Sequence, residues 1–500
     1  MEDDVAPSNN FLEDYTDALS FATFIDWSFD QQFAANTFKV VHPRTDSIVE
    51  WLQPHIKRFN QMLEDAGALT RVRYDCLEIV HDDEALPGEV KLIMYDGVYP
   101  LRWSRDSGDP RLASAYYDSG EDIDYGLLHE QGHQLGLIDL YALDVSQSQN
   151  KVNGESRRGM LCLMDGVFHF ISKCSALALN SWHGKRRGYF GQYLYDVPAE
   201  NRIRFLEADG APLAGANITI YQKVKVEVGR AEIPNVPKFK GRTDENGTFV
   251  LPNVQINNTL FTPTETGNIL RPNPFGYISN HGENGVFLIE IEKGGFKDYQ
   301  WIDITSFNIA YWEGHTEQAT YEIKTRLSSK ITTELPAELT EENAIDWSAR
   351  AEDNLLTIVE NDYLFKQVGK ASIKLTTESG GDVSLRYPTL TIAKWNLTAK
   401  KYVNIWFYSE NPNVGFQGCS PWIRLGNLKT GGYLQYQTDA DILNDAIGNW
   451  QCYRIPLNGD ELWHLTKIGE VSLNEINYIE IHADTWGYGF TLWVDGLSFD

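Results

Sequence analysis

The spacing of apolar residues in the first 200 positions predicts an α+β domain. Steps of three and four residues predict a helix from Ser47, which forms a capping box with Glu50, to a stop at Gly67. The same spacing predicts helices over Asp122–Gly136 and Ser172–Arg187. Short apolar runs between turn residues predict strands over Thr37–Val41, Arg71–Val80, Glu89–Tyr95 and Ala113–Tyr117.

From Asn201 onward the pattern changes to short strands of alternating apolar and polar residues, separated by Gly, Asn and Pro turns. A Pro-containing linker over Thr332–Leu339 divides this part of the chain. We therefore expect a multidomain protein, with an α+β domain at 1–198 and all-β sandwich domains at 199–328 and 329–500. The length of 500 residues also favours three domains.

The second predicted helix carries a motif with the spacing of a metal site, His-Glu-x-x-His-x-x-Gly-x-x-Asp. His129 and His133 stand four residues apart, so both imidazoles lie on one face of the helix. Two such imidazoles can hold one Zn²⁺, and Asp139, three residues after Gly136, can supply a third ligand. Glu130 is placed to reach a water on the metal. The alternative is an ordinary amphipathic helix whose histidines are surface or core residues.

A possible methionine turn follows the motif in the run Met160-Leu-Cys-Leu-Met-Asp-Gly166. Together the motif and the turn resemble the metzincin zinc endopeptidases, in which Met164 would lie beneath the metal. An aspartate as third ligand is similar to the snapalysins. The run Leu135–Tyr141 also looks like the immune-inhibitor-A family, although Ile138 stands where that family usually has proline. The resemblance covers about residues 110–190.

The resemblance implies that His129, His133 and Asp139 bind zinc and leave a fourth position for water. It implies that Glu130 is the general base, which takes a proton from that water and passes it to the departing amine. It also implies that the strand Ala113–Tyr117 binds an extended substrate by adding it to the edge of the sheet. A strand with a purely structural role is the alternative.

Two further resemblances concern the β-rich part of the chain. Asp209–Tyr221 and Gly241–Phe249 look like a carboxypeptidase-regulatory-like β-sandwich, either a rigid spacer or a partner site. The ending Phe490–Phe499 looks like the last strand of a jelly-roll carbohydrate-binding module, and residues 340–500 hold eight of the 14 tryptophans. Exposed Trp rings can stack on sugars, whereas others form the core. The resemblance makes Asp495 a candidate calcium ligand; a turn carboxylate is the alternative.

Composition narrows the possible partners and the redox setting. A net charge of −27 and a pI of about 4.8 argue against nucleic-acid and anionic-membrane partners. No stretch approaches the roughly 18 apolar residues of a membrane span, and the first ten residues lack the pattern of a signal peptide. Disulfides between Cys162 and Cys174 and between Cys419 and Cys452 would leave Cys76 alone. Five buried thiols are the alternative.

These observations predict a secreted or cell-surface zinc metalloendopeptidase that cleaves extracellular proteins or glycoproteins. Its cofactor is Zn²⁺, with a structural Ca²⁺ as a further candidate, and its C-terminal module would bind glycans. The alternative is a glycan-binding surface or adhesin protein whose zinc site is structural or inactive. Glu130 argues against that alternative, because a structural site does not need a carboxylate beside its first ligand.

Overall fold

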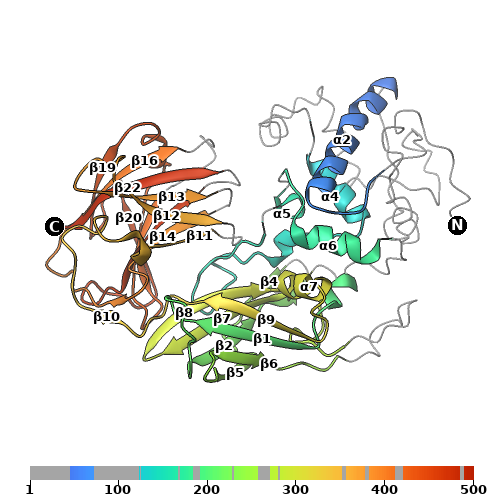
Figure 1. Cartoon of the computed structure of the whole chain (residues 1–500), viewed down its shortest axis with the longest axis horizontal. Helices are drawn as coiled ribbons and strands as arrows, with labels where there is room; N and C mark the ends of the chain where they lie inside the picture. The colour runs from blue at the N-terminus through green and yellow to red at the C-terminus, as the bar shows by residue number, and fades with distance from the viewer. Residues whose placement is uncertain are drawn as a thin grey trace, which may run out of the picture.

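The computed structural model of the chain describes residues 45–72, 123, 125–160, 162–166, 169–183, 192–227, 230–256, 271–279, 282–351, 356–377, 382–410, 421–484 and 489–500. This part is mostly β-sheet, with few helices (Figure 1). The predicted strands Thr37–Val41, Glu89–Tyr95 and Ala113–Tyr117 lie outside the described residues, as does Arg71–Val80 beyond Val72. The α+β character of the first predicted domain therefore stays a prediction.

The described residues before position 199 form helices and loops. The α-helices are α2 (Thr45–Asp65), α4 (Tyr125–Gln134), α5 (Leu163–Gly166) and α6 (Lys173–Trp182), and the short 3₁₀ helices are η6 (Leu140–Leu143) and η7 (Gln192–Tyr195). The helices predicted over 47–67, 122–136 and 172–187 correspond to α2, α4 and α6. Ser172 begins α6 as its N-cap, because its hydroxyl accepts a hydrogen bond from the Ser175 N–H.

The first β-sandwich consists of two sheets. One sheet has the order β6-β1-β9, with bounds Thr248–Leu251, Glu200–Leu206 and Gln318–Lys324. The other has the order β5-β2-β7-β8, with bounds Phe239–Arg242, Asn217–Gln222, Val286–Lys293 and Phe296–Asp303. Strand β1 pairs in parallel with β9 and antiparallel with β6. A hairpin of β3 (Val224–Glu227) and β4 (Arg230–Glu232) precedes β5, and α7 (Ile304–Trp312) joins β8 to β9.

The C-terminal sandwich packs a six-stranded sheet against a five-stranded one. The six-stranded sheet has the order β11-β14-β21-β17-β18-β20, with bounds Ser348–Ala351, Asp382–Tyr387, Tyr478–Asp484, Trp422–Gly426, Tyr433–Gln437 and His464–Ile468. The five-stranded sheet has the order β12-β13-β22-β16-β19, with bounds Thr357–Asp362, Ser372–Thr377, Phe490–Phe499, Tyr402–Glu410 and Gln451–Pro456. The neighbouring strands of both sheets pair antiparallel, and β10 (Ile331–Thr332) and β15 (Ile392–Ala393) form a separate short parallel pair.

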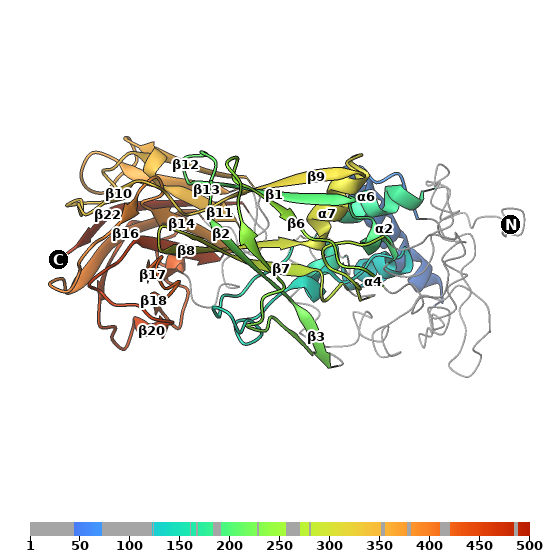
Figure 2. The ribbon, with the colours of Figure 1, turned by 90° about the horizontal axis from the view of Figure 1, so that it is seen from below.

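The buried apolar residues form two clusters. One cluster runs from Ile56 on α2 through the motif helix and the first sandwich to Leu327, and it also includes Ile392, Leu428 and Tyr478. The other fills the C-terminal sandwich between Leu339 and Phe499. The helices and the first sandwich therefore share one hydrophobic core across position 198. The domain boundaries expected at 198 and 328 stay a prediction. Along the long axis the C-terminal sandwich occupies one end and the helices lie toward the other, with the first sandwich overlapping both (Figure 2).

No helix in the described ranges combines the length and apolarity that a membrane-spanning segment requires. The tryptophans of the C-terminal sandwich divide between core and surface. Trp347, Trp395, Trp463 and Trp493 are buried, whereas Trp406, Trp422 and Trp450 are partly exposed, and Trp486 lies outside the described residues. Strand alternation alone therefore does not decide which rings are available to a ligand.

Candidate metal centre

Helix α4 carries His129 and His133, and the turn at its C-terminus directs the following residues back toward these two side chains. The Leu137 N–H bonds the Gly132 carbonyl at 3.1 Å, and the Gly136 N–H bonds the His133 carbonyl at 2.8 Å. These two bonds form a Schellman motif, which requires a left-handed residue at its turn. Gly136 supplies that residue with a φ of 99°. The chain then reverses, which brings Asp139 back against the histidine face of the helix.

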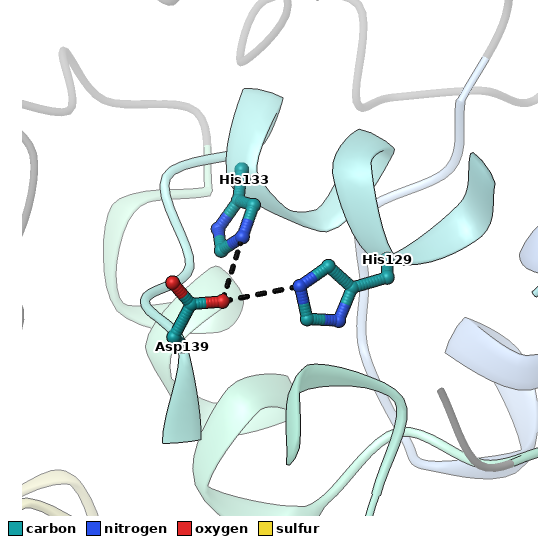
Figure 3. Close-up of side chains that lie close together, drawn as sticks. All are labelled: His129, His133 and Asp139. Atoms are coloured by element: carbon teal, nitrogen blue, oxygen red, sulfur yellow. Dashed lines mark hydrogen bonds and ion pairs between the residues drawn. The ribbon is translucent and has the colours of Figure 1, made fainter. Parts of the chain in front are cut away.

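The three predicted ligands converge on one point (Figure 3). The Oδ1 atom of Asp139 lies 3.1 Å from Nε2 of His129 and 2.9 Å from Nε2 of His133. The two imidazole rings stand edge to face, with centroids 4.7 Å apart. All three ligand atoms lie within 4.8 Å of one another, and they form the one cluster of three such groups found among the described residues. The spacing read from the sequence therefore corresponds to a real cluster.

The second nitrogen of each ring is held by a backbone carbonyl. Nδ1 of His129 lies 2.7 Å from the Leu163 carbonyl oxygen, and Nδ1 of His133 lies 2.8 Å from that of Leu137. A carbonyl only accepts, so each Nδ1 carries a proton and Nε2 is the ring atom that faces Asp139. Such contacts commonly orient metal-binding histidines.

This donor set fits a divalent metal. A metal that replaced the Nε2 protons would meet two nitrogen lone pairs and one carboxylate oxygen. Burial raises the pKa of Asp139, but the hydrogen bonds and charges of His129 and His133 outweigh burial and hold that pKa well below its usual range. Asp139 is therefore the anionic member of a two-nitrogen, one-oxygen ligand set of the kind zinc accepts.

Helix α5 contacts the motif helix next to the cluster, and the role of Met164 as a methionine turn stays a prediction. Met164 is fully buried, and its thioether packs directly against Gly132, between the two histidines of α4. The neighbouring residue Leu163 supplies the carbonyl that orients His129. The turn therefore positions the cluster by packing and by one hydrogen bond.

Two residues that sequence reasoning missed hold the chain around Asp139. The Tyr193 hydroxyl accepts a hydrogen bond from the Ile138 N–H at 3.1 Å. The buried ammonium of Lys223, on the first sandwich, donates to the carbonyls of Ala142 at 2.7 Å and Asp144 at 2.6 Å. Burial lowers the pKa of Lys223 to about 8. No motif marks either residue, because both act on backbone groups more than 50 positions away.

Solvent reaches the cluster. The side chains of His133 and Asp139 are 17% and 21% exposed, and that of His129 is 9% exposed. The half-exposed ring of Tyr141 lies parallel to His129, with centroids 6.2 Å apart. Glu130 lies on α4, next to His129, but its side chain is outside the described residues.

The cysteines do not form the disulfide that their spacing suggested after the motif helix. Cys162 and Cys174 are buried free thiols and form no disulfide with each other, so that pairing is wrong. Cys452 is free and exposed, whereas Cys76 and Cys419 lie outside the described residues. Sequence spacing was a poor guide here because it does not give the separation of two side chains.

Asp495 is fully buried and anchors a loop. Its carboxylate accepts hydrogen bonds from the N–H groups of Gln367 at 2.5 Å, Val368 at 2.8 Å and Gly496 at 2.8 Å. These bonds fit the structural explanation of the residue, and its role as a calcium ligand stays a prediction.

The loop that Asp495 anchors contributes Phe365 to an aromatic surface. On β16, Val403, Ile405 and Phe407 point into the core, so Tyr408 points outward. Rings in mutual contact there define the outer aromatic face: Phe365, Tyr408, Trp450 and Trp493. Trp493 is largely covered, whereas Phe365 is 36% exposed and Tyr408 and Trp450 are partly exposed. This face offers flat apolar surface of the kind that stacks on sugars.

Comparisons with known proteins give weak similarities. The sequence matches no protein-family model and no curated protein. Among solved structures, a family 11 carbohydrate-binding module from Clostridium thermocellum in complex with a mixed-linked tetrasaccharide is 13% identical, with a TM-score of 0.22 over 32% of this chain and 91% of that one. A family 30 module of a Clostridium thermocellum cellulosomal cellulase is 11% identical, with a TM-score of 0.24 over 33% and 96%.

An exo-β-agarase is 10% identical, with a TM-score of 0.24 over 33% of this chain and 25% of the agarase. This chain thus covers a quarter of the agarase. Similarities at these TM-scores are too weak to assign a function.

Proposed function

We propose that this chain is a zinc-dependent endopeptidase. The observation that carries the proposal is the convergence of His129 Nε2, His133 Nε2 and Asp139 Oδ1, with both Nδ1 atoms tied to backbone carbonyls. Three protein ligands with partial solvent exposure suit a catalytic metal, because a structural zinc is almost always closed by four protein ligands.

The chain's own residues would divide the chemistry among them. His129, His133 and Asp139 would hold Zn²⁺, which when bound supplies a Lewis acid that lowers the pKa of water and polarises a peptide carbonyl. Glu130 would accept the proton of the attacking water and deliver it to the departing amine. The backbone carbonyls of Leu163 and Leu137 would keep the two histidines oriented. The histidines would take no part in proton transfer.

The experiment measures zinc content and casein hydrolysis of the full chain, with and without a chelator. Wild-type protein should bind one zinc and lose hydrolysis on chelation. Glu130→Gln should keep zinc and lose roughly 10²–10⁴-fold in turnover, the usual worth of a general base. Zinc binding without hydrolysis in the wild-type protein, or full hydrolysis by Glu130→Gln, would overturn the proposal.

A second candidate function, glycan binding by the C-terminal sandwich, is favoured by a separate observation. The outer aromatic face places Phe365, Tyr408 and Trp450 together on partly exposed surface. Aromatic rings of this kind supply stacking area for the apolar faces of sugars. Both functions can coexist, since the face and the metal cluster belong to different parts of the chain.

A further inference from the structure

A polar cavity of about 110 Å³ is lined by residues from three parts of the chain. The segment after the metal ligands contributes Glu155 to Arg158, the first sandwich contributes residues such as Trp301, and the C-terminal sandwich contributes residues such as Trp422. Ser156 and Arg158 are exposed, so the cavity opens to solvent on their side.

Positive charge is concentrated in this cavity although the whole chain carries a net charge of −27. Five arginines line it: Arg157, Arg158, Arg326, Arg350 and Arg424. Glu155 is the one carboxylate in the lining, and burial raises its pKa. Burial lowers the pKa of the lining residue His482 to about 4, so this ring is neutral at pH 7 and adds no charge.

The acidic partners of these arginines are shared. Arg157 pairs with Asp303. Glu480 lies 3.7 Å from Arg326 and 3.9 Å from Arg424, and it also accepts a hydrogen bond from His482 at 2.6 Å. The single carboxylate of Glu480 therefore interacts with two arginines and one histidine.

Among the described residues Arg350 hydrogen-bonds a neutral amide, and the charges of Asp298 and Glu155 act on it from nearby. Its guanidinium donates to the Gln300 amide oxygen at 3.2 Å. A guanidinium has five N–H donors and binds carboxylates with two parallel hydrogen bonds. Arg350 is therefore equipped to take a further anionic acceptor.

Two further side chains have polar hydrogens left over. The Trp422 Nε1–H is buried and has no hydrogen-bond partner among the described residues. Beside the cavity, Arg386 is 3% exposed and stacks on the Tyr478 ring at 3.7 Å, and its Nε and Nη1 atoms likewise lack partners in the described part of the chain. Unsatisfied buried donors are costly, and an acceptor-only ligand would remove that cost.

We propose that this cavity binds a carboxylate-bearing sugar, a uronic or sialic acid unit of a glycan. Arg350, together with Arg424, would bind the carboxylate, and the indoles of Trp301 and Trp422 would face the sugar ring. The two tryptophans favour an acidic sugar over an acidic peptide. This site is separate from the metal cluster and from the outer aromatic face, so it does not rest on either function proposed above.

The test titrates the full chain with glucuronic acid and with N-acetylneuraminic acid by calorimetry, in a chelator so that metal plays no part. Either acid should bind, more weakly at high salt, whereas glucose should not. Arg350→Gln should weaken binding at least about tenfold, as expected for hydrogen bonds to a charged group. The matched control, Arg204→Gln, removes an arginine from an exposed pair with Glu322 and should bind as wild type.

A second variant keeps the test independent of any folding defect in Arg350→Gln. Trp422→Phe retains an aromatic ring but removes the N–H donor, so it should weaken binding of the acid several-fold while the thermal midpoint stays near that of wild type. Equal binding of glucose, equal affinity for an oligoglutamate peptide, no binding of either acid, or unchanged affinity in both folded variants would overturn the proposal.

Discussion

Gly132 and Met164 are in direct contact next to the cluster of His129, His133 and Asp139. A Cβ atom at position 132 would overlap the Met164 sulfur and would lie 3.2 Å from its terminal methyl group. Gly132 belongs to the turn of α4 that separates His129 from His133, so the thioether fixes how closely α5 approaches the ligands. The absence of a side chain at this position is a requirement of the packing.

We expect Gly132→Ala to destabilise the fold and weaken zinc binding, because α4 or Met164 must shift. Overpacking of this kind costs about 1–3 kcal/mol. Denaturant unfolding of the metal-free protein and a zinc competition assay measure the two effects. Met164→Leu, which nearly keeps the volume, should do less, and adding Met164→Ala to Gly132→Ala should restore part of the loss. A Gly132→Ala protein with wild-type stability would contradict the packing argument.

Asp139→Ala should lower zinc affinity and peptidase activity together, because it removes the anionic ligand. The loss of zinc affinity should exceed the 10–100-fold that is typical when a residue hydrogen-bonded to a metal ligand is removed. His169→Ala is a suitable control, since His169 stacks on Tyr125 with centroids 4.2 Å apart and takes no part in the cluster. If Asp139→Ala retained stoichiometric zinc while His169→Ala or His183→Ala lost it, the assignment of Asp139 would be wrong.

Asp165 should make stability depend on pH. Burial and the Asp144 carboxylate raise the pKa of Asp165 to about 7, from 3.8 for a free side chain. Between pH 3.8 and 7 the folded state therefore binds more protons than the unfolded state, and the free energy of unfolding falls as pH rises, by at most about 1.4 kcal/mol per unit. The cost is absent below that window and complete above it.

Asp165→Asn should consequently raise the free energy of unfolding most above pH 7 and least near pH 4. Urea unfolding of the metal-free protein across this range measures the difference from wild type. The exposed residue Asp439, changed to Asn, provides the control and should leave the wild-type pH profile in place. If the free energy of unfolding of Asp165→Asn ran parallel to that of wild type across this pH range, the Asp165 carboxyl would not be protonated in the folded state.

The outer aromatic face should account for any glycan binding by the C-terminal sandwich. Tyr408→Ala and Trp450→Ala should each weaken binding by about 1–2 kcal/mol or more, as for aromatic residues at the centre of a binding site. Glycan-array screening followed by affinity electrophoresis with calcium present measures the effect. Tyr277→Ala, at an exposed position of the first sandwich, is the control. Absence of binding across the array would remove this candidate function.

Asp495→Asn should destabilise the loop that carries Phe365, because an amide nitrogen replaces an oxygen that accepts hydrogen bonds from the N–H groups of Gln367 and Val368. Unsatisfied buried donors cost about 1–3 kcal/mol each. From the hydrogen bonding we expect the same fall in thermal midpoint with calcium and with a calcium chelator. Protection by calcium that is present in wild type and lost in Asp495→Asn would instead identify a calcium ligand, as the resemblance suggests.

The sequence alone was sufficient for the local parts of the site. His129 and His133 share a face because the helix repeats every 3.6 residues, and Gly136 and Asp139 follow His133 by three and six residues. All of these positions lie within eleven consecutive residues, so their geometry depends little on the rest of the fold. Only the resemblance pointed to Met164, which lies against Gly132, and its role beneath a metal stays a prediction. Strand alternation likewise indicated the predominance of β-strands after Asn201, although it did not predict α7.

Tertiary structure decided every feature that joins distant segments. It chose Leu163 as the carbonyl partner of His129, placed Lys223 beneath the loop after Asp139, and kept Cys162 and Cys174 apart. Alternation shows which strand residues share a face, but it does not show what covers that face. Trp395 and Trp450 thus look equivalent in the sequence, yet the first is buried and the second is partly exposed, because burial depends on the packing of strands that meet only after the chain has folded.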